Sequence, residues 1–406
     1  MHQLSTYFFA IALAISVAAT PLVQVREPNV RLPFKRFFNI SGTTLPDIDR
    51  ARAAHLKELG KTLSKRQSSF SVTNEAVTYV ASVGVGSPPT TYTLIIDTGS
   101  SNTWVGAGRA FVTTSTSVNT GRSVSVTYGS GSFSGTEYTD TVTLSSDLVI
   151  TGQGVGVASR SSGFDGVDGI LGIGPTDLTE GTVSGVSSVP TVTDNLFTQG
   201  TISERVVGVF FAPTNTLETT NGELTFGGVD SSRISGSISY ASFTSTSPAT
   251  FYIGIDESIT YGSATGSTVL SSTAGIVDTG TTLLLIATDA FNRYVSLTGA
   301  VQDNATGLLR ISSANYAKLR SLFLNVGGTS YEFTANAQTW PRALNTAIGG
   351  SSNNIYLIVA DLGSNSGEGL DFINGYVFLE RYYSVYDTTN NRVGFAATSN
   401  TFSTLN

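Results

Sequence analysis

One short pattern occurs twice in the chain, and it constrains the fold more than any other feature of the sequence. An apolar run leads into Asp-Thr-Gly in the segment TLIIDTGSSNTW, which contains Asp97, and again in AGIVDTGTTLLLI, which contains Asp278. Apolar runs that end in a glycine turn are typical of buried strands. A later apolar stretch that ends in glycine also occurs once in each half, in residues 166–174 and 370–378. The sequence therefore predicts two related lobes with a binding site between them.

Polar and apolar residues alternate in many short stretches of the body. In residues 123–144, Val124, Val126 and Tyr128 fall on one face of a strand and Gly-Ser-Gly follows, which predicts a β-hairpin with a glycine-containing tip. Segments with helical character are short and cover residues 192–200, 288–299 and 312–323. The predicted fold class is therefore all-β with minor helices.

The chain contains no cysteine and only two histidines, His2 and His55. Both precede the dibasic pair Lys65-Arg66, which is a candidate processing site; a solvated linker is the alternative. Cleavage after Arg66 would leave a chain of 340 residues without His or Cys. Such a chain cannot use Ser-His-Asp or Cys-His catalysis, and it cannot bind zinc through imidazole or thiolate ligands. We therefore expect no metal and no cofactor, and acid–base chemistry by carboxylates, hydroxyls and tyrosines.

The first 19 residues look like a secretory signal peptide. The apolar run from Tyr7 to Ala19 is too short to span a bilayer and ends in small residues. A short interfacial anchor is the alternative, but we expect a secreted, extracellular protein without stable membrane association. The predicted divisions are a signal peptide (1–19), a basic propeptide (20–66), an N-terminal lobe (67–243) and a C-terminal lobe (244–406).

Charge is divided unequally between the leader and the body. Ten of the 22 Lys and Arg residues, but only four of the 29 acids, lie in residues 1–66, which leaves 12 bases against 25 acids in residues 67–406. We therefore expect the leader to dock on the body electrostatically and to be released at low pH, when carboxylates are protonated. An acidic body repels phosphate, so nucleic acid is not an expected partner.

Asp97 and Asp278 are predicted to act as a pair. Two buried carboxylates held together cannot both ionise easily, so they share one proton. Such a pair can accept a proton from water while it donates one to a substrate carbonyl, which is general acid–base hydrolysis of an amide. A single Asp-Thr-Gly is more often an ordinary exit from a strand, but two copies in a chain without other catalytic groups favour catalysis. Neighbouring glycines allow the turns, and neighbouring hydroxyls can lock the turns together and bond the outer carboxylate oxygens. These residues are Thr98, Gly99, Ser100, Thr279, Gly280 and Thr281.

On these motifs the sequence resembles the pepsin-like aspartic protease family, and within it the cysteine-free secreted fungal polyporopepsin group. The resemblance covers residues 70–400 and rests on DTGSSNTW, VTYGSGSFSG, VDGILGIG, VDTGTT and FLERYYSVYDTTNNRVGFA. It implies an aspartic endopeptidase made as a zymogen, which acts at acid pH, prefers large hydrophobic residues around the cleaved bond and is inhibited by pepstatin. It also implies a monomer, two β-lobes related by a pseudo-twofold axis, and a water shared between Asp97 and Asp278.

The resemblance also assigns residues around the cleft. Tyr128 corresponds to the flap tyrosine, Gly129 and Ser130 to flap residues whose backbone binds substrate, and Trp104 to the tryptophan beside the flap tyrosine. Plain core packing is the alternative for the two aromatic residues. Residues 29–38 resemble the strand-forming prosegment of the family. The candidates to neutralise the two aspartates in the precursor are Lys35, Lys57 and Lys61.

The alternative function is a catalytically inactive pepsin-like protein that binds peptides or another protein. Its basis is Asn374, which stands where the family pattern has leucine; a buried amide there would need hydrogen-bond partners. A two-carboxylate glycosidase is the other enzymatic alternative, but it needs neither paired Asp-Thr-Gly turns nor a flap. We interpret Asp168 as a structural turn acid, and Asn304 begins an Asn-X-Thr sequon that is a candidate glycosylation site.

Overall fold

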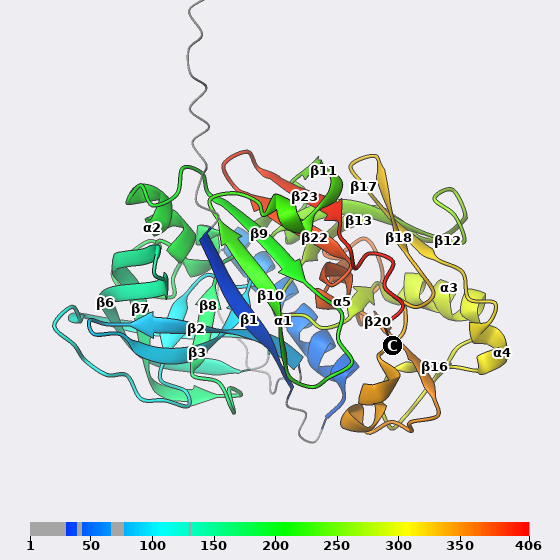
Figure 1. Ribbon diagram of the computed structural model, residues 1–406, viewed down its shortest axis with the longest axis horizontal. Coiled ribbons are helices and arrows are strands. Elements are labelled where there is room, and N and C mark those ends of the chain that lie inside the picture. The colour runs from blue at the N-terminus through cyan, green and yellow to red at the C-terminus, as the bar shows by residue number, and fades with distance from the viewer. Residues whose placement is uncertain (1–29, 39–42, 66–76, 130, 406) are drawn as a thin grey trace, which may run out of the picture.

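The computed structural model describes residues 30–38, 43–65, 77–129 and 131–405 and shows two lobes built mainly from strands (Figure 1). The predicted signal peptide, Arg66 and Ser130 lie outside the described residues. Among the helices of the described ranges, none is both long enough and apolar enough to cross a membrane. The predicted fold class, an all-β bilobal protein with minor helices, is confirmed by this architecture.

The largest sheet has thirteen strands and includes the strand that ends in Asp97. Its central strand order places the leader strand β1 between β10 and β2, so the leader is an integral part of the sheet. In spatial order the strands are β11 (Ser235–Ser242), β23 (Arg392–Ala397), β22 (Tyr382–Asp387), β9 (Val206–Phe211), β10 (Thr219–Phe226), β1 (Val30–Phe38), β2 (Val77–Val85), β3 (Thr90–Asp97), β8 (Gly169–Gly172), β4 (Thr103–Val105), β7 (Leu148–Ser162), β6 (Ser132–Ser145) and β5 (Val118–Thr127).

Two smaller sheets form the second lobe. The seven-stranded sheet runs β18 (Thr329–Phe333), β17 (Leu322–Val326), β12 (Gly254–Tyr261), β13 (Ser267–Val277), β21 (Phe372–Asn374), β14 (Leu284–Ile286) and β20 (Val359–Asp361). The three-stranded sheet runs β15 (Val301–Gln302), β16 (Leu309–Ile311) and β19 (Ile355–Leu357). The chain leaves the large sheet after β11 and returns to it with β22 and β23. The exact boundary between residues 243 and 244 stays a prediction.

The helices are few, and most lie at the edges of the sheets (Figure 1). They are α1 (Leu45–Lys65), α2 (Val192–Thr198), α3 (Thr288–Thr298), α4 (Ser313–Tyr316) and α5 (Tyr376–Leu379), with 3₁₀ turns η1 (Thr176–Thr179), η2 (Ser231–Arg233), η3 (Ala249–Phe251) and η4 (Arg342–Ile348). The helix predicted over residues 312–323 is wrong beyond Tyr316. There Leu322, Leu324 and Val326 are buried at alternate positions, so the period is that of a strand and the segment forms β17.

The longest helix, α1, is a feature that the sequence prediction missed. It begins after Thr44, whose side-chain oxygen accepts a hydrogen bond from the backbone N–H of Asp47. Leu45, Ile48 and Leu56 recur at helical spacing and are buried against the second lobe and the cleft. The composition of residues 45–65, rich in Ala, Leu, Lys, Arg and Glu, was the available signal.

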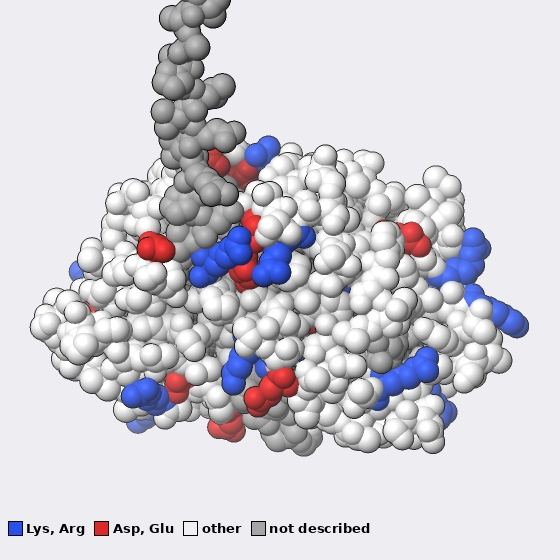
Figure 2. All heavy atoms as spheres, in the orientation of Figure 1, with Lys and Arg blue, Asp and Glu red and all other residues white. Residues whose placement is uncertain are grey.

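The predicted hairpin is present, with β5 and β6 paired antiparallel and Val126 opposite Phe133. Strand β5 is mostly exposed and buries only Val124, whereas from Asp140 to Ser145 of β6 buried residues alternate with half-buried ones, because one face of the sheet packs on the core. Figure 2 shows that charge on one face of the molecule is confined to small groups, and that basic and acidic side chains lie close together in some of them. Most of that surface is uncharged, as the 13% content of charged residues leads one to expect.

Candidate active site

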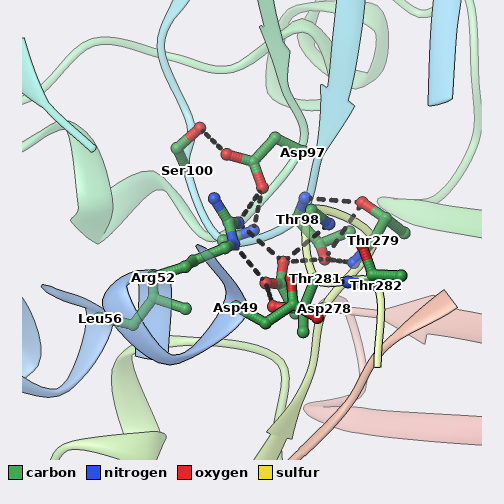
Figure 3. A network of polar contacts seen from close by, with 12 residues as sticks. Asp49, Arg52, Leu56, Asp97, Thr98, Ser100, Asp278, Thr279, Thr281 and Thr282 are labelled. Carbon is green, nitrogen blue, oxygen red and sulfur yellow. Dashed lines mark hydrogen bonds and ion pairs between the residues drawn. The ribbon is translucent and has the colours of Figure 1, made fainter. Parts of the chain in front are cut away.

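The two Asp-Thr-Gly turns lie against each other (Figure 3). β3 and β13 each end in a buried turn, and each turn donates a backbone N–H to the threonine of the other. Thr98 N lies 3.0 Å from Thr279 Oγ1, and Thr279 N lies 2.9 Å from Thr98 Oγ1. These reciprocal hydrogen bonds satisfy two buried backbone donors and fix the positions of the two turns relative to each other.

The carboxylate of Asp97 is 1% exposed and is held by its own turn. Gly99 N donates to Asp97 Oδ1 at 2.9 Å, and Ser100 Oγ donates to Oδ2 at 2.6 Å. The glycine also keeps space open, because a Cβ at Gly99 would meet the guanidinium of Arg52. The turn therefore fixes both oxygens of a buried carboxylate.

The turn at Asp278 repeats this arrangement from the other lobe. Gly280 N donates to Asp278 Oδ1 at 3.1 Å, and Thr281 Oγ1 donates to Oδ2 at 2.6 Å. Asp278 is 0% exposed. The two sets of bonds match donor for donor, so the structure brings together both carboxylates and all six of the predicted supporting residues.

A guanidinium from the leader lies between the two carboxylates. Arg52 Nη2 is 2.5 Å from Asp97 Oδ1 and 3.0 Å from Asp278 Oδ1, and Arg52 Nε is 2.7 Å from Asp278 Oδ2. One nitrogen thus contacts both aspartates, which places their carboxylates side by side. Burial acts to raise the pKa of Asp278, but the positive charge and hydrogen bonds of Arg52 prevail and lower this pKa below its ordinary value.

The prediction that a leader lysine neutralises the aspartates is therefore wrong. Lys35 lies 3.9 Å from Glu218, Lys57 bonds Ser364 and Glu368, and Lys61 pairs with Glu58. Arg52 takes the position instead, because a guanidinium is a planar fork that can bond two carboxylates at once. An ammonium group is a single point charge and cannot reproduce this geometry.

Helix α1 also contacts each lobe beside the dyad. Asp49 accepts hydrogen bonds from the backbone N–H groups of Thr282 (3.2 Å) and Leu283 (2.7 Å) in the second lobe. Burial raises the pKa of Asp49 to about 7. On the other side, His55 faces the backbone of Thr127 at the end of β5; burial, assisted by the charge of Arg52, lowers the pKa of His55 to about 4. The helix thus lies between the end of β5 and the second lobe.

Comparison with known proteins identifies the family. The sequence model of the eukaryotic aspartyl proteases matches residues 78–398. Polyporopepsin of Irpex lacteus is 66% identical over 340 residues, which are 83% of this chain and 99% of that protein. The chain belongs to the eukaryotic aspartyl protease family. It is a pepsin-like aspartic endopeptidase.

Two further relatives place the protease within this family. Gastricsin of Homo sapiens is 30% identical over 392 residues, which are 90% of this chain and 95% of that protein. The crystal structure of aspartic proteinase from Irpex lacteus matches with a TM-score of 0.79 at 66% identity, and the match covers 81% of this chain and 96% of that chain. The likeness therefore extends over both lobes.

The predicted flap of the protease packs against the leader helix. Tyr128 is buried, and its ring stacks at 6.4 Å from the ring of Trp104, which also stacks on Phe133 at 4.2 Å. A Cβ at Gly129 would meet the backbone of Arg52, so the glycine permits close approach of α1. Trp104 and Tyr128 are therefore both buried in the core, and their rings also lie next to each other.

Other predicted residues of the protease lie away from the dyad. Asp168 accepts from the backbone N–H groups of Thr93 (2.8 Å) and Arg109 (2.7 Å), as expected for a structural turn acid. Asn304 is exposed. Asn374 lies beside the Asp278 turn, where its backbone carbonyl accepts a hydrogen bond from the backbone N–H of Asp278 at 3.1 Å. In the described ranges, no group of three or more His, Asp or Glu side chains has the arrangement of a metal site.

Three residues that matter for the site of the protease were not predicted from the sequence. Arg52 and Asp49 lie in a leader helix that was not predicted, and their contacts depend on how that helix enters the cleft. The third is Glu257, which is fully buried on β12 and bonded to Asn374. The signal for Glu257 was a pair of consecutive acids, Asp256 and Glu257, between isoleucines in GIDESITY, but the facing partner could not be known from the sequence.

Proposed function

We propose that this endopeptidase cleaves peptide bonds with a water activated jointly by Asp97 and Asp278. The observation that supports it is the matched pair of buried carboxylates within reach of a single guanidinium nitrogen. In the leader-free enzyme, an anionic pair without Arg52 shares one proton, since two adjacent carboxylates resist double ionisation. The ionised member takes a proton from water, the oxygen of that water attacks the carbonyl carbon, and the protonated member donates to the carbonyl oxygen. Transfer of the dyad proton to the amide nitrogen then breaks the C–N bond, and a hydroxyl proton of the tetrahedral intermediate returns to the dyad as the carboxyl product forms, which regenerates the singly protonated pair.

We also propose that residues 20–66 form an inhibitory propeptide. Arg52 occupies the position that the activated water requires, and β1 is held in the large sheet by pairing on both edges. Basic residues of the leader face acids of the body: Arg31 lies 2.9 Å from Asp230, and Lys57 lies 3.3 Å from Glu368. Removal of the leader after Arg66 would therefore open the cleft.

Release at acid pH follows from the sign of two of the pKa shifts. The lowered pKa of Asp278 means that docking is stabilised above the ordinary pKa of an aspartate and loses this contribution as the pH falls through the lowered value. The lowered pKa of His55 contributes to docking above about 6.5 and loses that contribution as the pH falls to about 4. Asp49 acts in the opposite sense: its raised pKa favours docking below about 3.8, and this contribution is lost as the pH rises through about 7. We therefore expect the lost contributions of His55 and Asp278 to determine how low the pH can fall before the leader is released.

The remaining parts of the proposal are supported by the sequence. They comprise secretion by the signal peptide, action as a monomer on protein or peptide substrates with large hydrophobic residues around the cleaved bond, inhibition by pepstatin, and a glycan on the exposed Asn304. The buried Tyr128–Trp104 pair supports a flap that closes over bound peptide.

The test is hydrolysis of a protein substrate from acid to neutral pH by protein cleaved after Arg66, with and without pepstatin. We expect cleavage that rises with acidity and is blocked by pepstatin, while the full chain held at neutral pH is inactive. Folded, leader-free protein without any cleavage would contradict the proposal and favour a peptide-binding protein.

A further inference from the structure

A buried polar pair behind the Asp278 turn lacks one hydrogen-bond donor. Glu257 on β12 and Asn374 on β21 are both 0% exposed, and Asn374 Nδ2 donates to Glu257 Oε2 at 2.8 Å. The remaining oxygens, Glu257 Oε1 and Asn374 Oδ1, are also buried and have no hydrogen-bond partner among the described residues. An ionised carboxylate and an amide oxygen only accept hydrogen bonds, so neither can satisfy the other. Leaving both unsatisfied would destabilise the fold.

We propose that Glu257 is a neutral carboxylic acid that donates from Oε1 to Asn374 Oδ1, and that this acid–amide pair positions the Asp278 turn. A proton on Oε1 supplies the missing donor and closes a pair with two hydrogen bonds. The pair acts on the site through the backbone: Asn374 is in register with Val277, and the carbonyl of Asn374 accepts the N–H of Asp278 at 3.1 Å. The inference rests on the proposed catalytic role of Asp278.

The surroundings of Glu257 favour the neutral form. The neighbouring strands β13, β17, β14 and β21 contain no Asp, Glu, Lys, Arg or His. On its own strand, Asp256 accepts from Thr244 Oγ1 at 2.8 Å. Beyond the ends of β13 and β21, Asp278 is bonded to Arg52 and Asp371 to Thr273, and Glu332 on β18 is bonded to Ser321. Burial raises the pKa of Glu257 to about 8, and the hydrogen bond from Asn374 offsets only part of this rise.

The first lobe holds an apolar pair at the equivalent positions. Leu171 lies opposite Ile96, one residue before Asp97, as Asn374 lies opposite Val277. Val83 lies opposite the residue five before Asp97, as Glu257 lies opposite Thr273, five before Asp278. Two buried apolar side chains can therefore support such a turn, and the second lobe replaces them with a polar pair whose strength depends on pH. Its contribution to stability is complete below about pH 4.5 and is lost as the pH rises to about 8.

The first experiment compares denaturant unfolding of the full chain from about pH 6 to about pH 8 in wild type and Glu257→Gln. Glutamine can make both hydrogen bonds with Asn374 and does not titrate. We expect the unfolding equilibrium constant of wild type to rise with pH about tenfold per unit more steeply than that of Glu257→Gln. The control Glu180→Gln makes the same substitution at an exposed site and should follow wild type. Equal pH slopes in wild type and Glu257→Gln would overturn the proposal.

A second measurement keeps the test decisive if Glu257→Gln folds poorly. The infrared C=O absorption of protonated carboxylic acids in wild type at neutral pH should include a component that Glu257→Val lacks, and the absence of any such difference would overturn the proposal. Glu257→Val and Asn374→Leu should each lower stability, because each leaves one buried polar group without its partner. The double variant grafts the apolar pair of the first lobe and should recover stability; additive losses would contradict the pairing.

Steady-state kinetics tests whether the pair positions the Asp278 turn. After acid activation, the two single variants should lower kcat with little change in KM, and the double variant should restore kcat. Unchanged kcat in both single variants would limit the pair to stability and overturn its positioning role. The infrared and unfolding measurements need no turnover, so failure of the acid–amide pair is distinguishable from failure of the proposed function of the dyad.

Discussion

The turn at Asp97 and the turn at Asp278 have the same bonds at their tips and different support behind them. In both, a backbone N–H and a hydroxyl hold the carboxylate, and a threonine accepts the N–H of the opposite turn. Behind the first turn lie Val83 and Leu171, which are apolar, and behind the second lie Glu257 and Asn374. The leader helix adds another difference, since it contacts the first lobe through His55 and the second through Asp49. The chemistry at the tips is shared, while the response to pH differs between the lobes.

The largest expected effect tests the equivalence of the two tips. Asp97→Asn and Asp278→Asn should each lower kcat of the leader-free enzyme by about 10²–10⁴-fold, because each removes one member of the acid–base pair. Both variants should keep the wild-type circular dichroism spectrum, since the asparagine Oδ1 can accept the glycine N–H and its Nδ2 can donate to the neighbouring hydroxyl oxygen. Appreciable turnover by either variant at acid pH would show that the lobes do not contribute equally to the dyad.

The next effect tests the guanidinium that joins the two tips. Arg52→Gln should weaken docking of the leader by about 3–5 kcal/mol, because it leaves the buried carboxylates without their cation. The full chain should then bind a fluorescent pepstatin at a pH where wild type does not. Lys57→Gln is the matched control, because Lys57 contacts Ser364 and Glu368 rather than the dyad. An equal effect of both substitutions would argue for general electrostatic attraction instead of a specific contact.

A smaller effect tests the symmetry of the bonds between the turns. Thr98→Val and Thr279→Val each leave one buried backbone N–H of the opposite turn without its acceptor. Each should lower the free energy of unfolding by about 1–3 kcal/mol. Thermal and denaturant unfolding of the two variants should agree closely. A large difference between them would show that one lobe depends on the other more than the reciprocal geometry implies.

The smallest effect is on the pH dependence of leader release. His55→Gln removes a group that opposes docking as the pH falls from about 6.5 to about 4. The equilibrium constant for leader release should therefore depend less steeply on pH in this range, by up to about tenfold per pH unit, which corresponds to one proton. Asp49→Asn removes a group of opposite sign, so release should become steeper between about pH 7 and about pH 4. The measurement is the rate at which the full chain binds fluorescent pepstatin across this range. Changes of the same sign in both variants would contradict the assignment of opposite roles to the two contacts.

Much of the protease was predictable because its signals are local. Apolar runs that end in Asp-Thr-Gly predicted the two turns, and alternation around Tyr128 predicted the hairpin of β5 and β6. Helices α2 and α3 were predicted from short amphipathic segments. The helix predicted over residues 312–323 is present only as α4 and is wrong beyond Tyr316, because Leu322, Leu324 and Val326 follow a strand period. Patterns of this kind depend on a few neighbouring residues, so the sequence carries them directly.

By itself, then, the sequence determined the strand-rich lobes, the paired aspartates and the basic character of the leader. Only the tertiary structure decided that Arg52, and not one of the lysines, lies between the carboxylates, because that contact depends on how α1 enters the cleft. It also decided that Glu257 meets Asn374, 117 positions further along the chain. Burial and facing partners control the protonation of such groups, and both are set by the packing of distant strands rather than by neighbouring residues.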